Sequence, residues 1–401
     1  MADLSQIIRG SLYKFTYPIF GAYFNTAMLV IFGAVFASLL YLIPKPYKKI
    51  AIFLASLSFI ILSSPLTNLI VFFLTIIVLF VCSNYKFRLR SIIFWVTEIF
   101  LILSTVIIYR VSGVLSAFFS FAAYYTAYRT IQYYVDATQN QTQQVSIFQY
   151  LFYILLFPSF SHGPIDRIEN LSVGNVERQH ILFGLKRILI GTLKFLALLY
   201  LFSRIPESAF SFKELYKWVI FTAYIGAIKL YLLFSGDIDI VVGIASLLGI
   251  RLSENFPRFP YTRSSLTQFW QNWQTTIVNF LTAYVYFPLC RNKRHIYLKT
   301  MLIIMIIGWA HLFYNTNEFP SFGGVLYYTL WGAFLGGTFA LSKYLERKAS
   351  DKKELIKDKY PTIARILYSD SRIIKFFNIW LTFTIIAVGW HSPLYRVLVN
   401  I

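Results

Sequence analysis

His311 is the residue whose type and surroundings point most directly to chemistry. It lies in the segment IIGWAHLFYN, residues 306–315, within an apolar run that favours a buried helix. Imidazole titrates near neutral pH, so a histidine in a cavity can take a proton from a hydroxyl and return it to a leaving group. The alternative is a neutral His311 that is hydrogen-bonded to a neighbouring helix, and this segment alone leaves both open.

A second group of polar residues lies in FPSFSHGPIDRIEN, from Phe157 to Asn170. The pair Gly163–Pro164 favours a turn, and Asp166 stands beside Arg167. One interpretation is a loop at a helix end with a local ion pair. The other is a structured loop at the mouth of a cavity.

Two carboxylates, Asp237 and Asp239, stand at the start of an apolar run that reaches about residue 250. The helix macrodipole stabilises carboxylates near an N-terminus, so helix capping is one predicted role beside a functional one. They make a poor acid–base pair, because residues two apart on a helix point to different sides.

The stretch from Arg251 to Gln274 mixes charges, aromatic residues and prolines. Proline interrupts a regular helix, and charges are costly in hydrocarbon, so this stretch is predicted to lie at an interface or to line an internal cavity. Trp270 and Trp273 are three residues apart, as on one helix face. Such tryptophans are typical of a membrane-interface belt, with the lining of a site as the alternative.

The composition of the chain indicates what kind of structure holds these residues in place. The chain of 401 residues is 57% hydrophobic and 13% charged, whereas ordinary soluble domains are about 25% charged. Most of it therefore cannot face water. The net charge of +20 comes from short basic clusters beside apolar runs, which favours the positive-inside pattern and binding to anionic lipids. Nucleic-acid binding is not expected, because no long basic stripe or motif is present.

The sequence lacks the motifs of several other kinds of site. The five histidines are scattered and the two cysteines form no CxxC pair, so neither a metal site nor a disulfide framework is predicted. No G-x-S-x-G segment or P-loop is present either.

Apolar runs of about 20 residues, the length that spans a bilayer as helix, recur along the chain. They lie at about 18–43, 65–82, 91–109, 111–127, 181–203, 216–234, 297–315, 322–342 and 373–390, with shorter runs at 50–63, 146–160, 237–250 and 275–290. The first run is predicted to be an anchor rather than a cleaved signal. No run alternates like a barrel strand, so we predict an all-α polytopic membrane protein.

The order of apolar and charged segments along the chain predicts three regions. Residues 1–145 would form N-terminal transmembrane helices, residues 146–342 the core, and residues 343–401 a charged cytoplasmic loop with a last transmembrane helix. Basic loops 44–49 and 83–90 are predicted to be cytoplasmic.

In their order along the chain, these segments resemble the membrane-bound O-acyltransferase family, in its bacterial branch. The segment from Phe234 to Lys293 resembles the family pattern F-S-G-Y-S-D, N-F, P-Y, F-W-x-x-W-H and Y-x-Y-x-P-L-x-x-N. Its matching residues are Phe234, Ser235, Gly236, Asp239, Asn255, Phe256, Pro260, Tyr261, Phe269, Trp270, Trp273, Tyr284, Tyr286, Pro288, Leu289 and Asn292. The loop matches the family's G-P-I-x-R through Gly163, Pro164, Ile165, Asp166 and Arg167. The segment around His311 resembles the one that holds the family's membrane-embedded histidine.

The apolar runs predict about eleven crossings, some of them tilted or re-entrant. The resemblance implies that these helices form a bundle around a tunnel. It implies that His311 activates an acceptor hydroxyl for attack on an acyl thioester. The residues that it suggests for the tunnel lining are Gln274, Asn272, Trp270, Trp273, Trp309, Asp239 and Asn255.

Three positions depart from the family pattern. Gln274 stands in place of the histidine of W-x-x-W-H, Ala310 precedes His311 where the pattern has tryptophan, and Leu335 replaces the histidine of L-W-G-x-x-H-G. Glutamine can form hydrogen bonds but cannot carry a proton at neutral pH. A mechanism that needs two histidines is therefore not available at these positions.

We expect transfer of a small acyl group, acetyl first, from a cytoplasmic thioester to a hydroxyl of a cell-envelope glycan or lipid-linked polymer. D-alanyl transfer to teichoic acid and a non-catalytic scaffold or transporter are the alternatives. No permanent cofactor is expected, and the donor would be acetyl-CoA or a phosphopantetheine carrier. Expected partners are membrane lipids, an acyl carrier protein or extracytoplasmic partner acyltransferase, and the polymer, at the bacterial plasma (inner) membrane.

Overall fold

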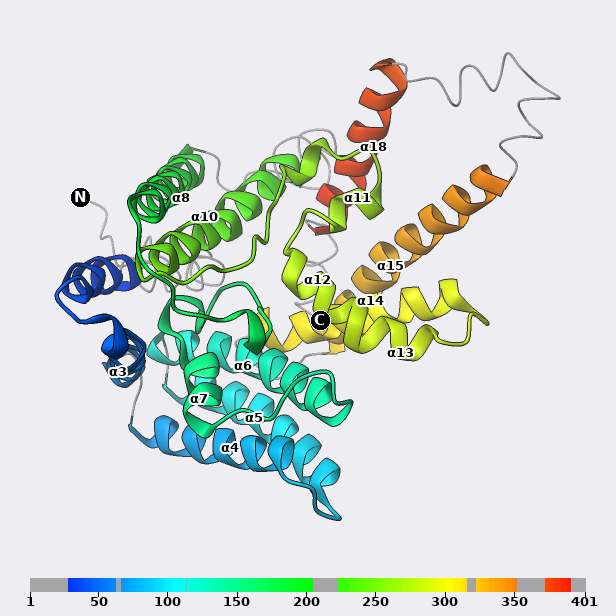
Figure 1. The fold of residues 1–401 in the computed structure, drawn as a ribbon. Helices are drawn as coiled ribbons and strands as arrows, with labels where there is room; N and C mark the ends of the chain where they lie inside the picture. Colours follow the sequence, from blue (N-terminus) through cyan, green and yellow to red (C-terminus); the bar gives the residue numbers. More distant parts are fainter. Residues whose placement is uncertain are drawn as a thin grey trace. The chain divides into compact units, whose positions relative to one another are not determined.

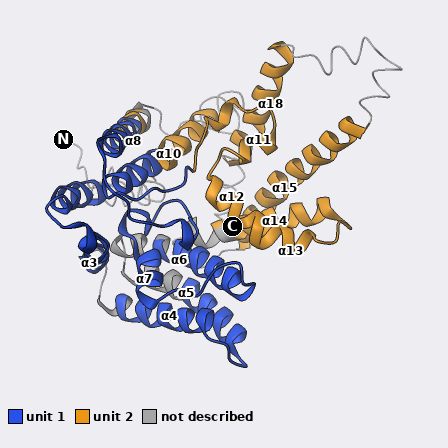
Figure 2. Ribbon diagram, in the orientation of Figure 1, with its two compact units in different colours: residues 1–194, 236–254 blue, residues 195–235, 255–401 orange. Residues whose placement is uncertain are grey.

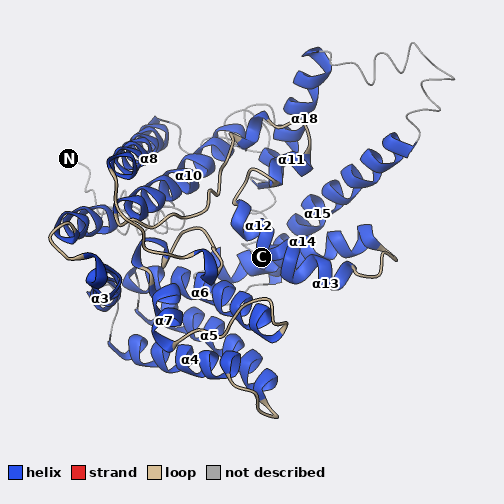
Figure 3. Ribbon diagram, viewed as in Figure 1, coloured by secondary structure: helices blue, strands red, loops and turns tan. Residues whose placement is uncertain are grey.

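The computed structural model describes residues 28–62, 66–112, 114–204, 223–315, 322–351 and 372–390. All the regular elements in these ranges are helices (Figures 1 and 3). The only strand-like feature among the described residues is an isolated bridge between Val173 and Ile250. The predicted all-helical architecture is confirmed.

The chain divides into two compact units, each built from two segments (Figure 2). Unit 1 comprises residues 1–194 and 236–254, and unit 2 comprises residues 195–235 and 255–401. Two long helices contribute to both units, because the divisions fall within them: α8, Arg178–Arg204, and α10, Ile225–Leu247.

Unit 1 consists of apolar helices and three short 3-10 turns around a tightly packed loop. Besides its parts of α8 and α10, it contains the helix Met28–Leu40, η1 (Lys45–Tyr47), α3 (Lys48–Leu62), α4 (Leu66–Asn84), α5 (Arg90–Ser112), α6 (Val114–Thr138), α7 (Ile147–Leu155), η2 (Phe157–Ser159) and η3 (Ile168–Asn170). Its aromatic residues interlock in the core: the ring of Phe157 lies 5.3 Å from that of Phe32 and 5.7 Å from that of Phe59.

Helix α7 explains why the short apolar run at 146–160 does not become a long helix. It begins at Ser146, whose Oγ accepts a hydrogen bond from the Gln149 backbone N–H at 3.2 Å. A serine in this place satisfies one of the unpaired amide groups of the first turn. The helix ends before Pro158, which has no N–H to continue the ladder, and the chain turns through η2.

Unit 2 consists of short helices followed by longer ones. Besides its parts of α8 and α10, it contains η6 (Pro260–Thr262), α11 (Leu266–Trp270), α12 (Thr275–Leu281), the π-helical turn η7 (Thr282–Tyr286), α13 (Phe287–Cys290), α14 (Ile296–Asn315), α15 (Phe322–Asp351) and α18 (Arg372–Trp390). Residues 251–265, before α11, contain no α-helix, as predicted from the prolines of this stretch.

The helix α10 corrects one sequence prediction. The runs 216–234 and 237–250 were expected as separate segments, but α10 continues from Ile225 to Leu247 without a break. Asp237 and Asp239 therefore lie inside a helix rather than at its N-terminus, and the predicted capping role is wrong. Both side chains are buried, which a helix interior permits only where partners compensate the charge.

The two tryptophans that were expected to share a helix face do not. Helix α11 ends at Trp270, and Trp273 follows in the turn before α12. Trp270 is half-buried, whereas Trp273 is 6% exposed within the aromatic core of unit 2. An interface belt requires a ring at the surface, so it does not describe Trp273.

The long helix α15 extends beyond its predicted apolar run. The run ends near residue 342, yet the helix continues through exposed charged residues to Asp351. The beginning of the charged insertion is thus helical, and residues 352–361 of it lie outside the described part of the chain.

Three described helices are long and apolar enough to cross a membrane: α10, α15 and α18. Shorter apolar helices occupy Met28–Leu40, Leu69–Asn84, Thr275–Cys290 and Ile296–Trp309.

Candidate functional site

His311 lies on α14, four residues before the last residue of that helix, Asn315. Its Nδ1 is 2.8 Å from the backbone oxygen of Ile307, one turn earlier. A carbonyl oxygen only accepts, so Nδ1 must carry the proton in this bond. In a neutral imidazole, the other nitrogen, Nε2, then holds the lone pair that can accept a proton. The structure does not enclose this side chain in protein atoms, because it is exposed on the helix surface.

The partner helix α15 supplies the surroundings of His311. The ring of Trp331 lies 5.2 Å from the imidazole, and Trp309 donates from Nε1 to the Thr329 hydroxyl at 2.8 Å. The two helices approach closely at Gly332, where an added Cβ would come within 2.6 Å of the Met305 Cα. Small residues allow this kind of close packing between membrane helices, and here they bring Trp331 against the histidine.

Trp331 also packs against the aromatic core of unit 2, which contains Trp273. The Trp273 ring lies 4.5 Å from that of Trp390, 5.2 Å from Phe256 and 5.7 Å from Phe269. Trp273 and Phe269 are buried and the other two rings are partly buried, so we interpret this cluster as a packed support. Trp331 therefore contacts both His311 and the hydrophobic cluster to which Trp273 belongs.

The structure brings two predicted residues together in a buried amide pair. Asn255 Nδ2 donates to Gln274 Oε1 at 2.8 Å. The Asn255 Oδ1 accepts from the Thr276 backbone N–H at 3.3 Å and from its hydroxyl at 2.6 Å. Gln274 has a φ of 45°, in the left-handed region that is uncommon for residues other than glycine. The side chains of both amides are buried.

Asn272 has a local role instead. Its Nδ2 donates to the backbone oxygen of Gln268 at 2.8 Å, one turn earlier. This bond satisfies a carbonyl at the end of α11.

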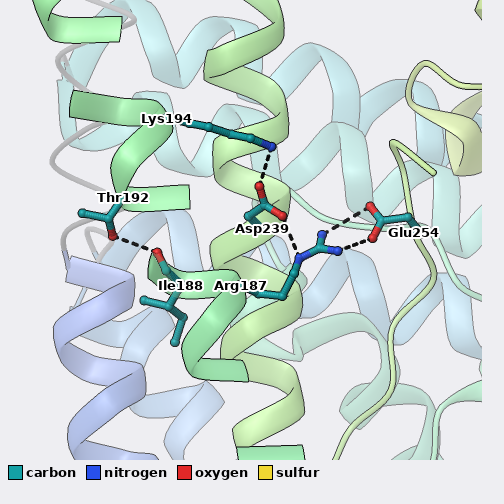
Figure 4. A network of polar contacts seen from close by, with 6 residues as sticks. All are labelled: Arg187, Ile188, Thr192, Lys194, Asp239 and Glu254. Atoms are coloured by element: carbon teal, nitrogen blue, oxygen red, sulfur yellow. Dashed lines mark hydrogen bonds and ion pairs between the residues drawn. The ribbon is translucent and has the colours of Figure 1, made fainter. Parts of the chain in front are cut away.

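Asp239, also predicted as a site residue, lies in unit 1 within an ionic network (Figure 4). Its carboxylate is 2.5 Å from Lys194 Nζ and 2.6 Å from Arg187 Nε. Arg187 also contacts the carboxylate of Glu254, with a second bond from Nη2 at 3.3 Å. Two cations face two carboxylates in these contacts, which join α8 to α10 and to the loop that follows α10.

Sequence reasoning did not single out Arg187 and Lys194. They lie in the apolar run predicted at 181–203, and they are seven residues apart, which places them on one helix face. Basic residues within an apolar helix are costly without a partner. That cost is the signal from which an acidic partner on another helix could have been predicted.

The G-P-I-D-R loop is held by contacts that separate its two charges. The Asp166 carboxylate accepts from the Ser253 backbone N–H at 3.1 Å and from the Ser253 hydroxyl, whereas Arg167 Nε lies 3.8 Å from the Asp136 carboxylate. Gly163 is required by close packing, since an added Cβ would be 2.6 Å from the Ser159 Cβ. The loop is therefore structured, and the cavity mouth that one interpretation placed there stays a prediction.

A buried arginine on α6 that the sequence did not reveal also fixes this loop. Arg129 is 2% exposed and directs its guanidinium at the backbone carbonyls of Tyr153, Ile154, Ser159 and Pro164. The shortest of these bonds, to Ser159, is 2.6 Å. These charge-assisted bonds tie the end of α7 and the turn η2 to Pro164 of the loop.

Loop stability is expected to depend on pH through His162. Burial lowers the pKa of His162 to about 4, whereas an unfolded histidine has a pKa of about 6.5. Between these values the unfolded chain binds more protons, so stability falls as the pH drops from about 6.5 towards 4. We expect the apparent unfolding temperature of the detergent-solubilised protein to fall by roughly 2–4 °C over this range.

The variant His162→Asn should show a smaller loss over the same range, because asparagine does not titrate. Thermal unfolding at pH 7 and pH 5 measures the difference. Equal losses in both proteins would contradict this prediction.

Among the described residues, no group of three or more His, Cys, Asp or Glu side chains gathers as a metal site would require. The chemistry that the described polar groups can support is proton transfer at His311 and hydrogen bonding by the amide pair.

Comparison with known proteins places these features in a family. Residues 118–316 match the model of the membrane-bound O-acyltransferase family. The range contains the G-P-I-D-R loop, the ionic network, the amide pair and His311.

Individual relatives are distant. A probable alginate O-acetylase of Pseudomonas fluorescens is 24% identical over 56% of this chain and 45% of its own length. A peptidoglycan O-acetyltransferase of Helicobacter pylori is 25% identical over 40% of this chain and 32% of its own. A teichoic acid D-alanyltransferase of Streptococcus thermophilus is 22% identical over 93% of this chain and 92% of its own. The match to the alginate O-acetylase thus spans less than half the length of that relative.

Proposed function

Because residues 118–316 form a domain of the membrane-bound O-acyltransferase family, we propose that this protein transfers a small acyl group from a cytoplasmic thioester to a hydroxyl of a cell-envelope polymer. The observation that carries the proposal is the bonding of His311. Its Nδ1 is committed to the Ile307 carbonyl, which leaves Nε2 as the base. The family match and the names of the relatives support the reaction class.

The proposed reaction needs one group that first accepts a proton as a base and then returns it as an acid. The acceptor oxygen attacks the thioester carbonyl carbon while His311 Nε2 takes the hydroxyl proton. The tetrahedral intermediate then expels the thiolate, and the imidazolium returns the proton to the sulfur. Because a thioester is a more activated acyl donor than the oxygen ester that forms, the transfer is downhill and requires no further energy source. Gln274 and Leu335 stand at the other two histidine positions of the family pattern, so in this proposal His311 acts without a second histidine there.

The proposed setting is the plasma membrane of a bacterium, with about eleven crossing or re-entrant helices around a tunnel that admits the donor from the cytoplasm. The apolar helices and the membrane-bound family support this setting. A coenzyme A thioester or a carrier protein with a phosphopantetheine arm would supply the acyl group. The net charge of +20 favours an acidic carrier.

Acetyl and D-alanyl are both candidates for the transferred acyl group. The relatives named as O-acetyltransferases favour acetyl. The D-alanyltransferase of Streptococcus thermophilus favours D-alanyl, because its match covers 93% of this chain and 92% of its own length. Both use the same base and the same bond exchange.

Mass spectrometry of envelope polymers from a deletion strain tests the proposal. We expect one polymer to lose its ester-linked acyl groups, and the mass lost identifies acetyl or D-alanyl. Complementation with the wild-type chain should restore the esters. Polymers with unchanged esters would contradict the proposal and favour a non-catalytic scaffold or transporter.

A further inference from the structure

Unit 1 contains a buried carboxyl group that the proposed acyl transfer does not use. Glu98 is the only acidic residue of α5, and it is 1% exposed. Its distance from Arg90, the first residue of the helix, is about 12 Å along the helix axis, from the usual rise per residue. An ionisable residue this far inside an apolar helix is costly in a membrane, so we treat Glu98 as a candidate functional residue.

The surroundings of Glu98 provide no counter-charge. Among the described residues, no lysine, arginine or histidine forms an ion pair with it. Its Oε2 atom is buried without a hydrogen-bond partner in the same part of the chain. One turn earlier on α5, the fully buried ring of Phe94 stacks on Tyr134 of α6 at 3.8 Å. An ionised carboxylate here would lack both a cation and water, and a buried carboxyl in such a place takes up a proton instead.

The hydrogen bond between Glu98 and Thr130 points to the same protonated form. Glu98 Oε1 is bonded to the Thr130 hydroxyl on α6, and that hydroxyl also lies 2.9 Å from the Thr126 carbonyl oxygen, one turn earlier. The buried Ser83 hydroxyl donates to the Leu79 carbonyl in the same way. A hydroxyl has one hydrogen and a carbonyl oxygen only accepts, so a Thr130 hydroxyl that donates to Thr126 has none left for Glu98. The bond to Glu98 then requires a hydrogen on the carboxyl group.

We propose that Glu98 is a proton-binding site of unit 1: at neutral pH its side chain is a carboxylic acid that donates to the Thr130 hydroxyl and so holds α5 against α6. An unfolded glutamate is ionised at neutral pH, so the native protein takes this proton from solution. The packing of α5 against α6 therefore depends on pH. This inference does not depend on the proposed acyl transfer.

Asp239 provides a contrast within the same unit. It is also buried, at 5% exposed, but its carboxylate contacts Lys194 and Arg187. Two cations favour the ionised form. The two carboxyl groups are thus matched in burial and differ in counter-charge, which makes Asp239 an internal control for the protonation of Glu98.

The apolar reagent N,N′-dicyclohexylcarbodiimide tests the protonation directly, because it reacts with a carboxylic acid and not with a carboxylate. The carboxyl oxygen bonds to the central carbon of the reagent, the O–H bond breaks, and a reagent nitrogen receives the proton. The O-acylisourea then rearranges to a stable N-acylurea. The labelled peptide therefore gains the mass of one whole reagent molecule.

The full-length protein in lipid vesicles should carry this adduct on Glu98 and not on Asp239, as measured by peptide mass spectrometry. Labelling of Glu98 at pH 7 should be within about twofold of that at pH 5, whereas the protonated fraction of an ordinary glutamate, with a pKa of about 4.3, falls about 80-fold over this range. Sodium chloride in place of choline chloride should not protect Glu98. Protection by sodium would overturn the proton as ligand and assign a metal ion instead.

The variant Glu98→Gln tests the site without a reagent. Glutamine keeps the shape and a hydrogen for Thr130, but it needs no proton from solution. Between pH 5 and pH 7 the native wild type binds one proton more than the unfolded chain, so its stability falls as the pH rises. We expect the unfolding temperature of wild type to fall relative to that of Glu98→Gln by roughly 2 °C per pH unit.

Other titratable groups do not disturb this comparison. His162 is present in both proteins, so its titration cancels. The groups packed around Glu98 and Tyr150 are neutral between pH 5 and pH 7: Cys82 from α4, Tyr133 from α6, and Tyr150 and Tyr153 from α7. Glu254→Gln is the matched control, because it makes the same change at a glutamate that is paired with Arg187. It should keep the pH dependence of wild type.

The same pH dependence in wild type and Glu98→Gln would overturn the proposal, whether or not the reagent reacts. A dependence that Glu98→Gln removes and Glu254→Gln retains would support it. If Glu98→Gln does not fold, the labelling decides: a fall of about 80-fold between pH 5 and pH 7 would show an ordinary, ionised glutamate and refute the site.

Discussion

The variant His311→Ala should transfer acyl groups about 10²–10⁴-fold more slowly than wild type, which is the usual contribution of a general acid–base residue. Alanine removes Nε2, and no other described histidine lies on α14 or α15. The measurement is release of free thiol from an acyl thioester in the presence of the acceptor polymer. The rate of the wild-type enzyme should fall as the pH is lowered and the imidazole becomes protonated, and this dependence should disappear in the variant.

The control for this variant is His295→Asn. His295 is an exposed histidine with a φ of 56° in the turn before α14. Asparagine tolerates the left-handed region well, so this change removes an imidazole without straining the chain. We expect wild-type activity. Full activity in His311→Ala, or an equal loss in His295→Asn, would refute the assignment of His311 as the base.

The folding of His311→Ala must be checked before a loss of its acyl-transfer activity is interpreted. His311 is exposed and makes one hydrogen bond, to a carbonyl of its own helix. Its removal should therefore change stability by less than about 1 kcal/mol. Size-exclusion chromatography and thermal unfolding of the solubilised variant verify this point.

The apolar runs of the sequence predicted most of the helices because a lipid-facing or core-facing helix must be apolar along its length. They failed where an acidic residue interrupted the pattern. Asp239 looked like a helix start, since the sequence alone does not show that Lys194, 45 residues earlier, neutralises it. Compensation between distant charges is a tertiary effect, and periodicity along one helix cannot reveal it.

The candidate site was predictable to a similar degree. His311, Asn255 and Gln274 were identifiable by residue type and order. The direction of the Gln274 amide was not, because it depends on which Asn255 atom meets the Thr276 backbone. Arg129 was missed for a related reason: its partners are backbone carbonyls, and carbonyls have no signature in a sequence.

The ionic network around Asp239 should carry a large share of the stability of unit 1. In Asp239→Asn, the side chain keeps its shape but loses the charge that faces Lys194 and Arg187. Both cations are mostly buried, with side chains 21% and 16% exposed. Removing one partner of a buried pair leaves charge uncompensated, and we expect a loss of about 3 kcal/mol.

Glu254→Gln is the matched comparison within the same network. The Glu254 side chain is 34% exposed, so water can replace part of its interaction with Arg187. The expected loss is below about 1 kcal/mol. In Asp239→Asn combined with Lys194→Met, one uncompensated cation is removed, and the double variant should be more stable than Asp239→Asn alone.

Cysteine reactivity can report these losses for each unit separately. Cys82 lies in unit 1 and Cys290 in unit 2, and both thiols are free and buried. In single-cysteine backgrounds, Asp239→Asn should lower the temperature at which a thiol-reactive dye labels Cys82 more than Glu254→Gln does. Because Asp239, Arg187 and Lys194 all belong to unit 1, the change at Cys290 should be smaller. Equal shifts of Cys82 labelling in Asp239→Asn and Glu254→Gln would contradict this prediction. The buried ion pairs of Asp239 would then contribute no more to the stability of unit 1 than exposed ion pairs do.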